Sequence, residues 1–286
     1  MPRKSRRKID KVHKGDKKDS HRLLLAILFD LKEKKTQEFL DNLVMNMSNI
    51  PERNMKTLLL KEKIESMPDD FSVEIVNRVF SKARPGEIDS AMFILSMVDI
   101  YSFHLEADSQ KLLKLYVICK DRGYDRTANF FLPPEPKRKP FSKFDFVEGR
   151  EMDYITLGEK RSLAKTREKD ILDRLLYDPS PLVVKNILEN PRITEHDVIK
   201  MVSRRPNNES VLKTIFRSEK WLSSYNVKLA MIKNPYTPVG IALGLLFFLK
   251  EQDLRDVSLD RSLHDVIKGT AGDLLGRKGN YLEKIR

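Results

Sequence analysis

Apolar residues in the second half of the chain recur at a spacing of four within short segments. The pairs are Ile171 and Leu175, Val184 and Leu188, Val198 and Val202, Val211 and Ile215, and Val227 and Met231. This spacing places each pair on one face of an α-helix. Because helices of about three turns are only marginally stable alone in water, each apolar face must be covered by a neighbour. The pattern therefore predicts a series of short, mutually packed helices.

Prolines mark the ends of these segments. Asp178, Asn190, Arg205 and Asn234 each precede a proline. Proline lacks a backbone N–H and disfavours the α conformation of the residue before it. We therefore expect each of the four residues to lie at or beyond a helix end.

Helix starts are marked close to the same prolines. Ser180-Pro181 and Thr237-Pro238 each match an N-cap residue followed by proline at the first helical position. Thr194 to Asp197 and Ser262 to Asp265 match a capping box in which Asp replaces Glu. All four steps predict helix N-termini.

Two of the segments repeat one another. Residues 183–191 and 227–235 both begin with Val and end in Asn-Pro, and their Asn-Pro steps are 44 residues apart, from 190 to 234. Leu188 and Ile232 hold the same register and should both be core residues. A repeat of this length is typical of stacked helical arrays, although an irregular helical bundle with a chance similarity is the alternative.

These segments resemble bacterial HEAT-like repeats of the leucine-rich-repeat-variant type, within the armadillo-like superhelices. The resemblance is carried by the order Asp-Pro-x-Pro, then Val, then Asn-Pro-x-Ile or Asn-Pro-x-Thr. The resemblance covers residues from about 160 to 275 and implies an α-solenoid there. Some members of the variant family carry a cysteine cluster for an iron–sulfur centre. This chain has a single cysteine, Cys119, so we expect no such centre and no other cofactor.

The pattern between residues 19 and 132 is also helical. The expected helices are 20–34, 36–48, 52–66, 71–83, 87–104 and 108–121, with a short one near 125–131. Gly123 is expected to cap the end of the helix before it. Because the Asn-Pro marker does not occur in this part, we treat it as a separate all-α domain, either a bundle or a degenerate set of repeats.

Together these patterns predict an all-α protein, with an N-terminal helical domain followed by a short HEAT-like or armadillo-like α-solenoid. Its expected parts are a basic disordered tail at 1–18, the N-terminal domain at 19–132, a linker at 133–158, the repeat domain at 159–275 and a basic end at 276–286. The linker is assigned from its prolines, which favour a stiff, extended chain.

Positive charge is concentrated at the N-terminus. Residues 1–22 contain ten Lys or Arg and three Asp or Glu, which accounts for more than half of the formal net charge of +12. The tail includes Arg3, Lys4, Arg6, Arg7 and Lys8. Such a tail can bind nucleic acid, acidic protein or anionic lipid, or can serve only to keep the protein in solution.

Two His-Asp steps, His196-Asp197 and His264-Asp265, match the metal-binding step of a phosphohydrolase. Each Asp is better explained as the last residue of a capping box, and further His ligands at matching positions are missing. Gly276 and Gly279 are spaced like the Gly-x-x-Gly loop of a KH domain, but a helix end capped by glycine is the preferred interpretation. We therefore expect no metal site and no catalytic residues.

Two features of the sequence bear on the compartment of the protein and on whether it crosses a membrane. Cys119 lies in an apolar segment and is expected to be a buried structural thiol, so a reducing and hence cytoplasmic compartment is indicated. The most apolar run, 239–249, is too short to span a bilayer, so we expect no transmembrane segment. Gly240 and Gly244 within it predict close packing of two helices.

The preferred function is a non-enzymatic scaffold or adaptor that binds an unidentified protein partner through its helical repeats. The alternative is a nucleic-acid-binding protein that uses the basic tail and cations on the repeat surface. The candidate surface residues are Lys185, Lys200, Arg204, Arg205, Lys213 and Lys228.

Overall fold

The structure is a computed structural model that describes residues 31–102, 109–139, 152 and 154–285, with side chains up to 276 in the last helix. All of the regular secondary structure in these residues is helical, which confirms the all-α class. The chain divides into two compact units, residues 1–49 and 50–286.

The described part of the first unit is one continuous helix over residues 31–48. The expected division into helices at 20–34 and 36–48 is therefore wrong at residue 35. Thr36, the expected helix start, lies inside this helix and donates from its hydroxyl to the carbonyl of Lys32 at 2.8 Å. A threonine whose hydroxyl bonds to a carbonyl of the preceding turn has its hydrogen bond inside the helix, so it need not mark a helix start.

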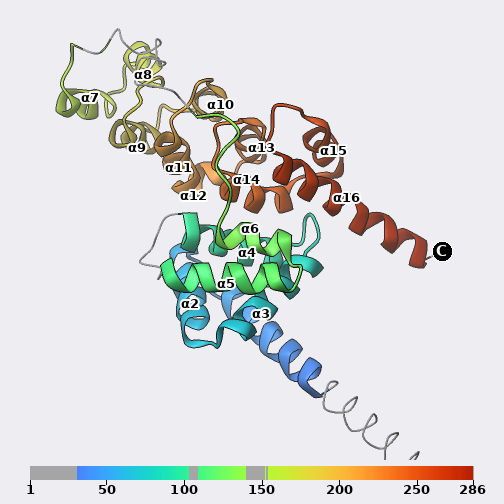
Figure 1. Cartoon of the computed structure of the whole chain (residues 1–286). Helices are drawn as coiled ribbons and strands as arrows, with labels where there is room; N and C mark the ends of the chain where they lie inside the picture. The colour runs from blue at the N-terminus through green and yellow to red at the C-terminus, as the bar shows by residue number, and fades with distance from the viewer. Residues whose placement is uncertain (1–30, 103–108, 140–151, 153, 286) are drawn as a thin grey trace, which may run out of the picture. The chain divides into compact units, whose positions relative to one another are not determined.

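The first half of the second unit contains five helices at nearly the expected positions (Figure 1). They are α2 (Arg53–Ser66), α3 (Asp69–Lys82), α4 (Ile88–Ser102), α5 (Ser109–Asp121) and α6 (Asp125–Phe131). Gly123 separates the last two with a φ of 71°, which confirms the expected glycine cap.

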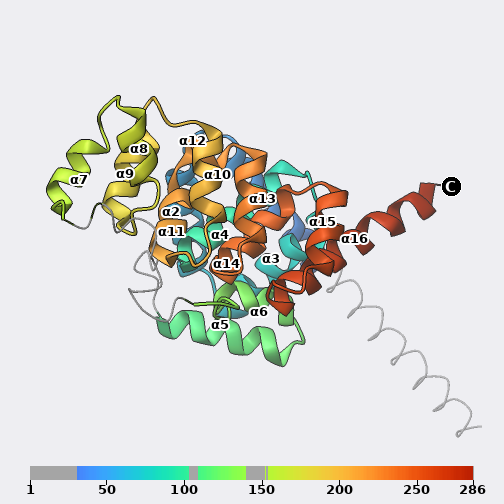
Figure 2. The ribbon, with the colours of Figure 1, turned by 90° about the horizontal axis from the view of Figure 1, so that it is seen from above.

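The second half continues with short helices. They are α7 (Leu157–Leu163), α8 (Lys169–Leu175), α9 (Pro181–Glu189), α10 (Glu195–Ser203), α11 (Glu209–Arg217), α12 (Glu219–Leu222), α13 (Tyr225–Lys233), α14 (Val239–Leu245), the 3-10 helix η3 (Leu246–Phe248), α15 (Glu251–Leu259) and α16 (Asp265–Ile285). Helix α9 packs on α7 and α11, α13 packs on α10 and α15, and α14 packs on α16. In Figures 1 and 2 the helices from α7 to α16 follow one another in a row.

The two Asn-Pro steps end their helices in the same way. Asn190 and Asn234 are the C-cap residues of α9 and α13. The Asn190 amide donates to the carbonyls of Ala164 and Thr166 at 2.8 Å each, beside the end of α7. The Asn234 amide donates to two carbonyls at the end of α10. Each asparagine thus satisfies carbonyls that an α-helix leaves unpaired at its end.

The two Pro-marked helix starts have different outcomes. Ser180 is the N-cap of α9 and Pro181 is the first helical residue, as expected. The equivalent expectation for Thr237 is wrong, because Pro238 is the N-cap and α14 begins at Val239. The Thr237 hydroxyl instead donates to the carbonyl of Met231 at 2.7 Å, so it serves the end of α13 and not the start of α14.

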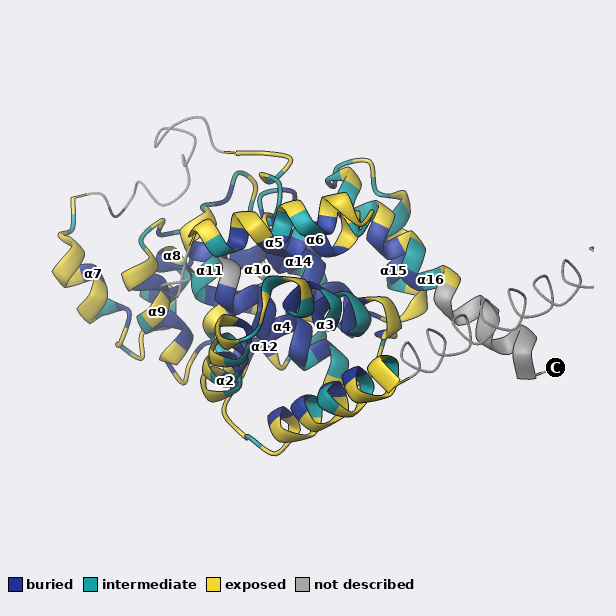
Figure 3. Ribbon diagram, turned by 60° about the horizontal axis from the view of Figure 1, so that its bottom comes forward, coloured by how far each residue is buried: buried dark blue, intermediate teal, exposed yellow. Residues whose placement is uncertain are grey.

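Helix α14 lies against α4; all of α14 is buried, as is α4 from Phe93 to Ile100 (Figure 3). A Cβ atom at Gly244 would lie 2.6 Å from Cγ2 of Val98. The expected close helix packing is therefore confirmed at Gly244, where only a hydrogen fits between the two helices.

The expected helix end at Gly276 is wrong. Helix α16 begins at Asp265 and continues through Gly276 and Gly279 to Ile285. Glycine is tolerated within a helix at a cost of about 1 kcal/mol relative to alanine, so these glycines do not by themselves terminate it.

The Pro-rich segment, whose described part is 133–139, binds the second half of the chain. Lys137 donates to the carbonyls of Arg261 and Leu263 at 2.8 and 3.0 Å, and the Arg138 N–H donates to Pro235 at 3.2 Å. Helices on both sides of this segment belong to one compact unit. The division into domains at 133–158 stays a prediction, and the rest of that linker lies mostly outside the described residues.

Replacing Gly244 by alanine tests the contact between α4 and α14. Val98 is stiff at χ1, so the added methyl group should force the helices apart and lower the free energy of unfolding by about 1–3 kcal/mol. Gly272→Ala is the matched control, because Gly272 is exposed in α16 and an added Cβ meets nothing within 4 Å. Urea unfolding of both variants should show a loss for the first only; equal stability would contradict the close contact.

Truncation tests the repeat register. Leu188 and Ile232 are 4% and 0% exposed, which confirms both as core residues. Leu188→Ala and Ile232→Ala should each lower the free energy of unfolding by about 2–5 kcal/mol through the lost apolar contacts and the cavity left behind. Leu182→Ala, at a half-exposed position of the same α9, should cost far less. A loss of less than about 0.5 kcal/mol at both core sites would be incompatible with this packing.

Candidate functional site

Three of the six basic residues expected on the repeat surface bind carbonyls at the ends of neighbouring helices. Arg204 donates to the carbonyl of Tyr177, just after α8. Arg205 donates at 2.7 Å to the carbonyl that ends α13. Lys228 donates at 3.0 Å to Ser223, the C-cap of α12. Helix ends carry unpaired carbonyls and partial negative charge, so these cations stabilise the helices on which they act.

The other three basic residues differ in exposure and pairing. Lys213 forms an ion pair with Glu209 one turn earlier in α11, at 2.7 Å. Lys200 is exposed on α10. Lys185 is exposed on α9 and lines a groove between α9 and α11. Of the six, only Lys185 is placed in this groove.

The burial of Lys228 agrees with a packing role. Its ammonium lies 5.2 Å from the centroid of the Phe248 ring, and desolvation lowers the pKa of this lysine below its ordinary value. A cation that is partly removed from water and bonded to a carbonyl is poorly placed to bind a large anionic partner. The tail residues Arg3, Lys4, Arg6, Arg7 and Lys8 lie outside the described residues.

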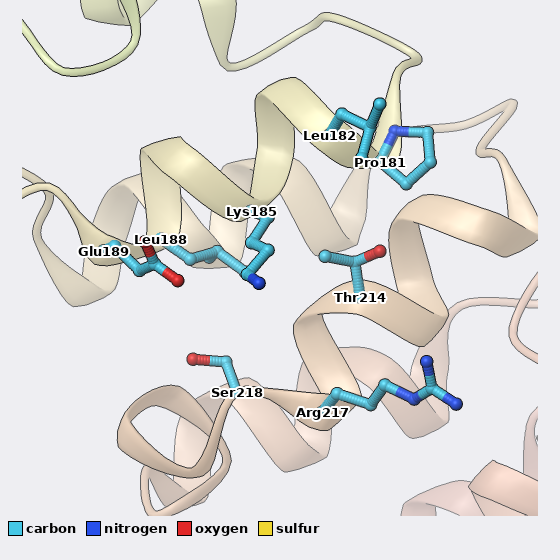
Figure 4. A pocket seen from close by; sticks show the side chains of 8 residues that line it. All are labelled: Pro181, Leu182, Lys185, Leu188, Glu189, Thr214, Arg217 and Ser218. Carbon is cyan, nitrogen blue, oxygen red and sulfur yellow. The ribbon is translucent and has the colours of Figure 1, made fainter. Parts of the chain in front are cut away.

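The groove between α9 and α11 encloses about 400 Å³ (Figure 4). Its lining residues are Pro181, Leu182, Lys185, Leu188, Glu189, Thr214, Arg217 and Ser218. The first five follow one stripe along α9, and the last three lie in the final turn of α11 and just after it. This volume falls within the range of about 300–1,000 Å³ that ligand sites occupy.

Two polar contacts fix the walls of the groove. The Trp221 indole N–H donates at 2.8 Å to the carbonyl of Leu188 and so ties α12 to the end of α9. Arg53 donates from Nη1 at 2.9 Å to the carbonyl of Phe216, in the last turn of α11. The groove is therefore held by two side chains, Trp221 and Arg53, that are not part of its lining.

Arg53 also forms a buried ion pair. Its Nε and Nη2 each donate to a different carboxylate oxygen of Asp99, both at 2.6 Å. Its guanidinium carbon lies 4.3 Å from the centroid of the Phe216 ring. One arginine on α2 thus binds α4 and α11, which lie far apart in the sequence.

Burial has a clear effect on the carboxyl partner. Desolvation raises the pKa of Asp99 above its ordinary value of 3.8, and the charge and hydrogen bonds of Arg53 offset only part of that cost. The folded protein therefore binds this proton more tightly than the unfolded chain. As the pH rises from 3.8 to the raised pKa, the contribution of Asp99 to stability falls.

The two His-Asp steps lie at helix starts, with one difference from expectation. Thr194 and Asp197 form the expected capping box at the start of α10, and Asp197 also binds Lys169 at 2.6 Å. The box expected at Ser262 is wrong, since His264 accepts from the N–H of Val266 and Asp265 pairs with Lys268. Among the described residues, no three His, Cys, Asp or Glu side chains are grouped as a metal ion would require.

Cys119 is fully buried in α5, as expected. Desolvation raises the pKa of its thiol to about 12. Because the thiolate is the reactive form of cysteine, this side chain is held unreactive at physiological pH.

The groove and the buried ion pair were missed by sequence reasoning. For the ion pair a signal was present: Asp99 is the one charged residue between Ala91 and Ile100 in α4, and Arg53 and Thr57 lie on the same helical face as Leu60 and Ile64. For the groove, Lys185 was named as a surface cation, but nothing in the local pattern linked it to Arg217 on another helix.

Comparison with protein-family models, with curated proteins and with solved structures found no match. No helix in the described part of the chain is both long and apolar enough to cross a membrane. Function must therefore be inferred from the residues and contacts of this chain.

Substitution of Arg53 tests the buried ion pair. Arg53→Met leaves Asp99 buried without its cation and should lower the free energy of unfolding by about 3–5 kcal/mol near neutral pH. The deficit should shrink as the pH falls towards the ordinary pKa of Asp99, because the carboxyl then takes up a proton. Urea unfolding of the variant and the parent protein across the acidic range measures both effects.

The control replaces both partners. Arg53→Met combined with Asp99→Leu removes the buried charge and should recover most of the lost stability. A deficit in the single variant that is equal at every pH would show that Asp99 is not the cause.

Proposed function

We propose that this chain is a non-enzymatic scaffold that binds a protein partner, with α7 to α16 forming a HEAT-like solenoid. The observation that carries the repeat assignment is a turn that occurs three times. At Asn190, Asn234 and Asp260, the side-chain oxygen accepts from the N–H two residues later, and the backbone carbonyl accepts from the N–H three residues later. A turn repeated at this level of detail supports repeated units more strongly than helix content does.

The packing order is consistent with the same proposal. Helix α9 packs on α7 and α11, and α13 packs on α10 and α15, so the contacts run between helices that follow one another closely along the chain. In a solenoid, each repeat contacts its neighbours. Such stacks present long surfaces built from successive helices, and these surfaces usually bind proteins or peptides.

The contacts of the basic residues favour a protein partner over nucleic acid. Arg204, Arg205 and Lys228 bind carbonyls of the protein itself, and Lys213 is paired with Glu209. A nucleic-acid surface needs several cations directed at successive phosphates. Four of the six candidate cations are thus already bound within the protein, and the basic tail remains a candidate for nucleic-acid contacts.

Deletion of residues 1–18 separates the two functions. The shortened protein should lose most of its affinity for DNA or RNA, because the tail carries most of the excess positive charge. It should still capture the protein partner from native lysate in the presence of nuclease. Capture should also persist at moderate salt, since recognition by packed helices is screened less.

The readouts are a salt titration of nucleic-acid binding and a pull-down with each form of the protein. The full-length chain is the control for both. Undiminished, sequence-selective nucleic-acid binding by the shortened form would overturn the scaffold proposal, as would partner capture that requires nucleic acid.

A further inference from the structure

We propose that the groove between α9 and α11 binds an extended, acidic peptide segment of the partner protein. This inference rests on the proposed scaffold function and names the chemistry of the recognised segment. It is carried by the shape of the groove, by its charges and by the contacts that fix its walls.

The shape suits a short extended chain. The α9 wall runs from Pro181 to Glu189, which at the rise of an α-helix is about 12 Å. An extended peptide advances about 3.3 Å per residue, so the wall can accommodate about four residues. Leu182, which is 49% exposed at one end of the stripe, gives an apolar contact for one side chain of such a peptide.

The charges favour an anionic occupant. Lys185 extends from α9 into the space between the helices, and Arg217 comes from the end of α11 on the other side (Figure 4). Glu189 is the only acidic residue of the lining, against two basic ones, of which Arg217 also acts electrostatically on the buried Asp99. Complementary charge increases both the association rate and the specificity of binding.

The walls are fixed before a ligand arrives. The Trp221 bond to the Leu188 carbonyl and the Arg53 bond to the Phe216 carbonyl hold the ends of α9 and α11. A preformed groove loses less conformational entropy on binding than one that must be ordered by its ligand. The buried ion pair of Arg53 therefore also supports recognition at the surface.

The lining fits a peptide better than a nucleic acid. None of its eight residues is aromatic, so it offers no ring on which a base can stack. Glu189 would repel a continuous phosphate backbone, whereas a peptide can place a neutral or basic residue beside it. Pro181 and Leu182 add apolar surface that phosphates cannot use.

Selection from a library of random octapeptides tests the proposal with the full-length protein. Peptides rich in Asp and Glu, with one apolar side chain, should be enriched. The best peptide, labelled with a fluorophore, should bind Lys185→Glu about fivefold or more weakly than the parent protein, because attraction becomes repulsion. Glu189→Gln should bind it more tightly. Both substitutions are at exposed positions, and unchanged urea midpoints confirm the fold.

The matched control is Lys200→Glu, which reverses an exposed cation on α10 outside the groove. All variants keep the same basic tail, so attraction by the tail cannot distinguish them. Equal affinity of the peptide for Lys185→Glu and Lys200→Glu would overturn the proposal, as would a library that shows no acidic enrichment. Displacement by a single-stranded oligonucleotide that depends on Lys185 would also overturn it, in favour of nucleic acid.

A failure here is distinguishable from a failure of the scaffold proposal. If Lys185→Glu captures the partner as well as the parent protein does, in the presence of nuclease, the scaffold stands and the groove is not its binding site. If capture by the parent protein itself requires nucleic acid, the scaffold proposal fails first.

Discussion

The second unit depends on the position of one arginine. Arg53 has its hydrogen-bonding groups directed at Asp99 on α4 and at the Phe216 carbonyl on α11, and its planar head lies against the Phe216 ring. Burying the two charges is costly, as the raised pKa of Asp99 shows. The guanidinium fork bonds α4 and α11 at the same time, so the pair links two helices that apolar packing alone would not hold in a fixed register. Such a pair can favour one arrangement of packed helices over others.

Short helices create a second constraint, because each helix end leaves carbonyls without partners inside the helix. The protein satisfies several of them with side chains from elsewhere in the chain. Asn190, Asn234, Arg205 and Trp221 do this among the helices from α7 to α15, and Lys137 does it from the Pro-rich segment. Cations and amides that look like a binding surface in the sequence are thus used inside the fold. Residues at the end of one helix thus also hold a neighbouring helix in place.

Local patterns in the sequence were enough to predict most helices and their ends. The positions of α2 to α6 follow from apolar periodicity, and the ends at Asn190 and Asn234 follow from the proline after each. The errors occurred where another hydrogen bond close by in the sequence replaced the expected cap. The Thr237 hydroxyl bonds back to Met231, and His264 caps a helix that Ser262 was expected to start. The groove could not be predicted, since it joins residues of α9 and α11 whose relation only the packed helices define.

The close contact between Gly244 and Val98 has a consequence for the order in which the chain is made. Helix α4 is rich in large apolar side chains, and its partner α14 is synthesised more than a hundred residues later. At about 5–20 residues per second, the ribosome needs on the order of 7–30 s to produce that partner. During this interval the apolar face of α4 that contacts α14 in the folded protein has no native partner. Between the synthesis of α6 and that of α14, this face of the nascent chain is open to non-native contacts.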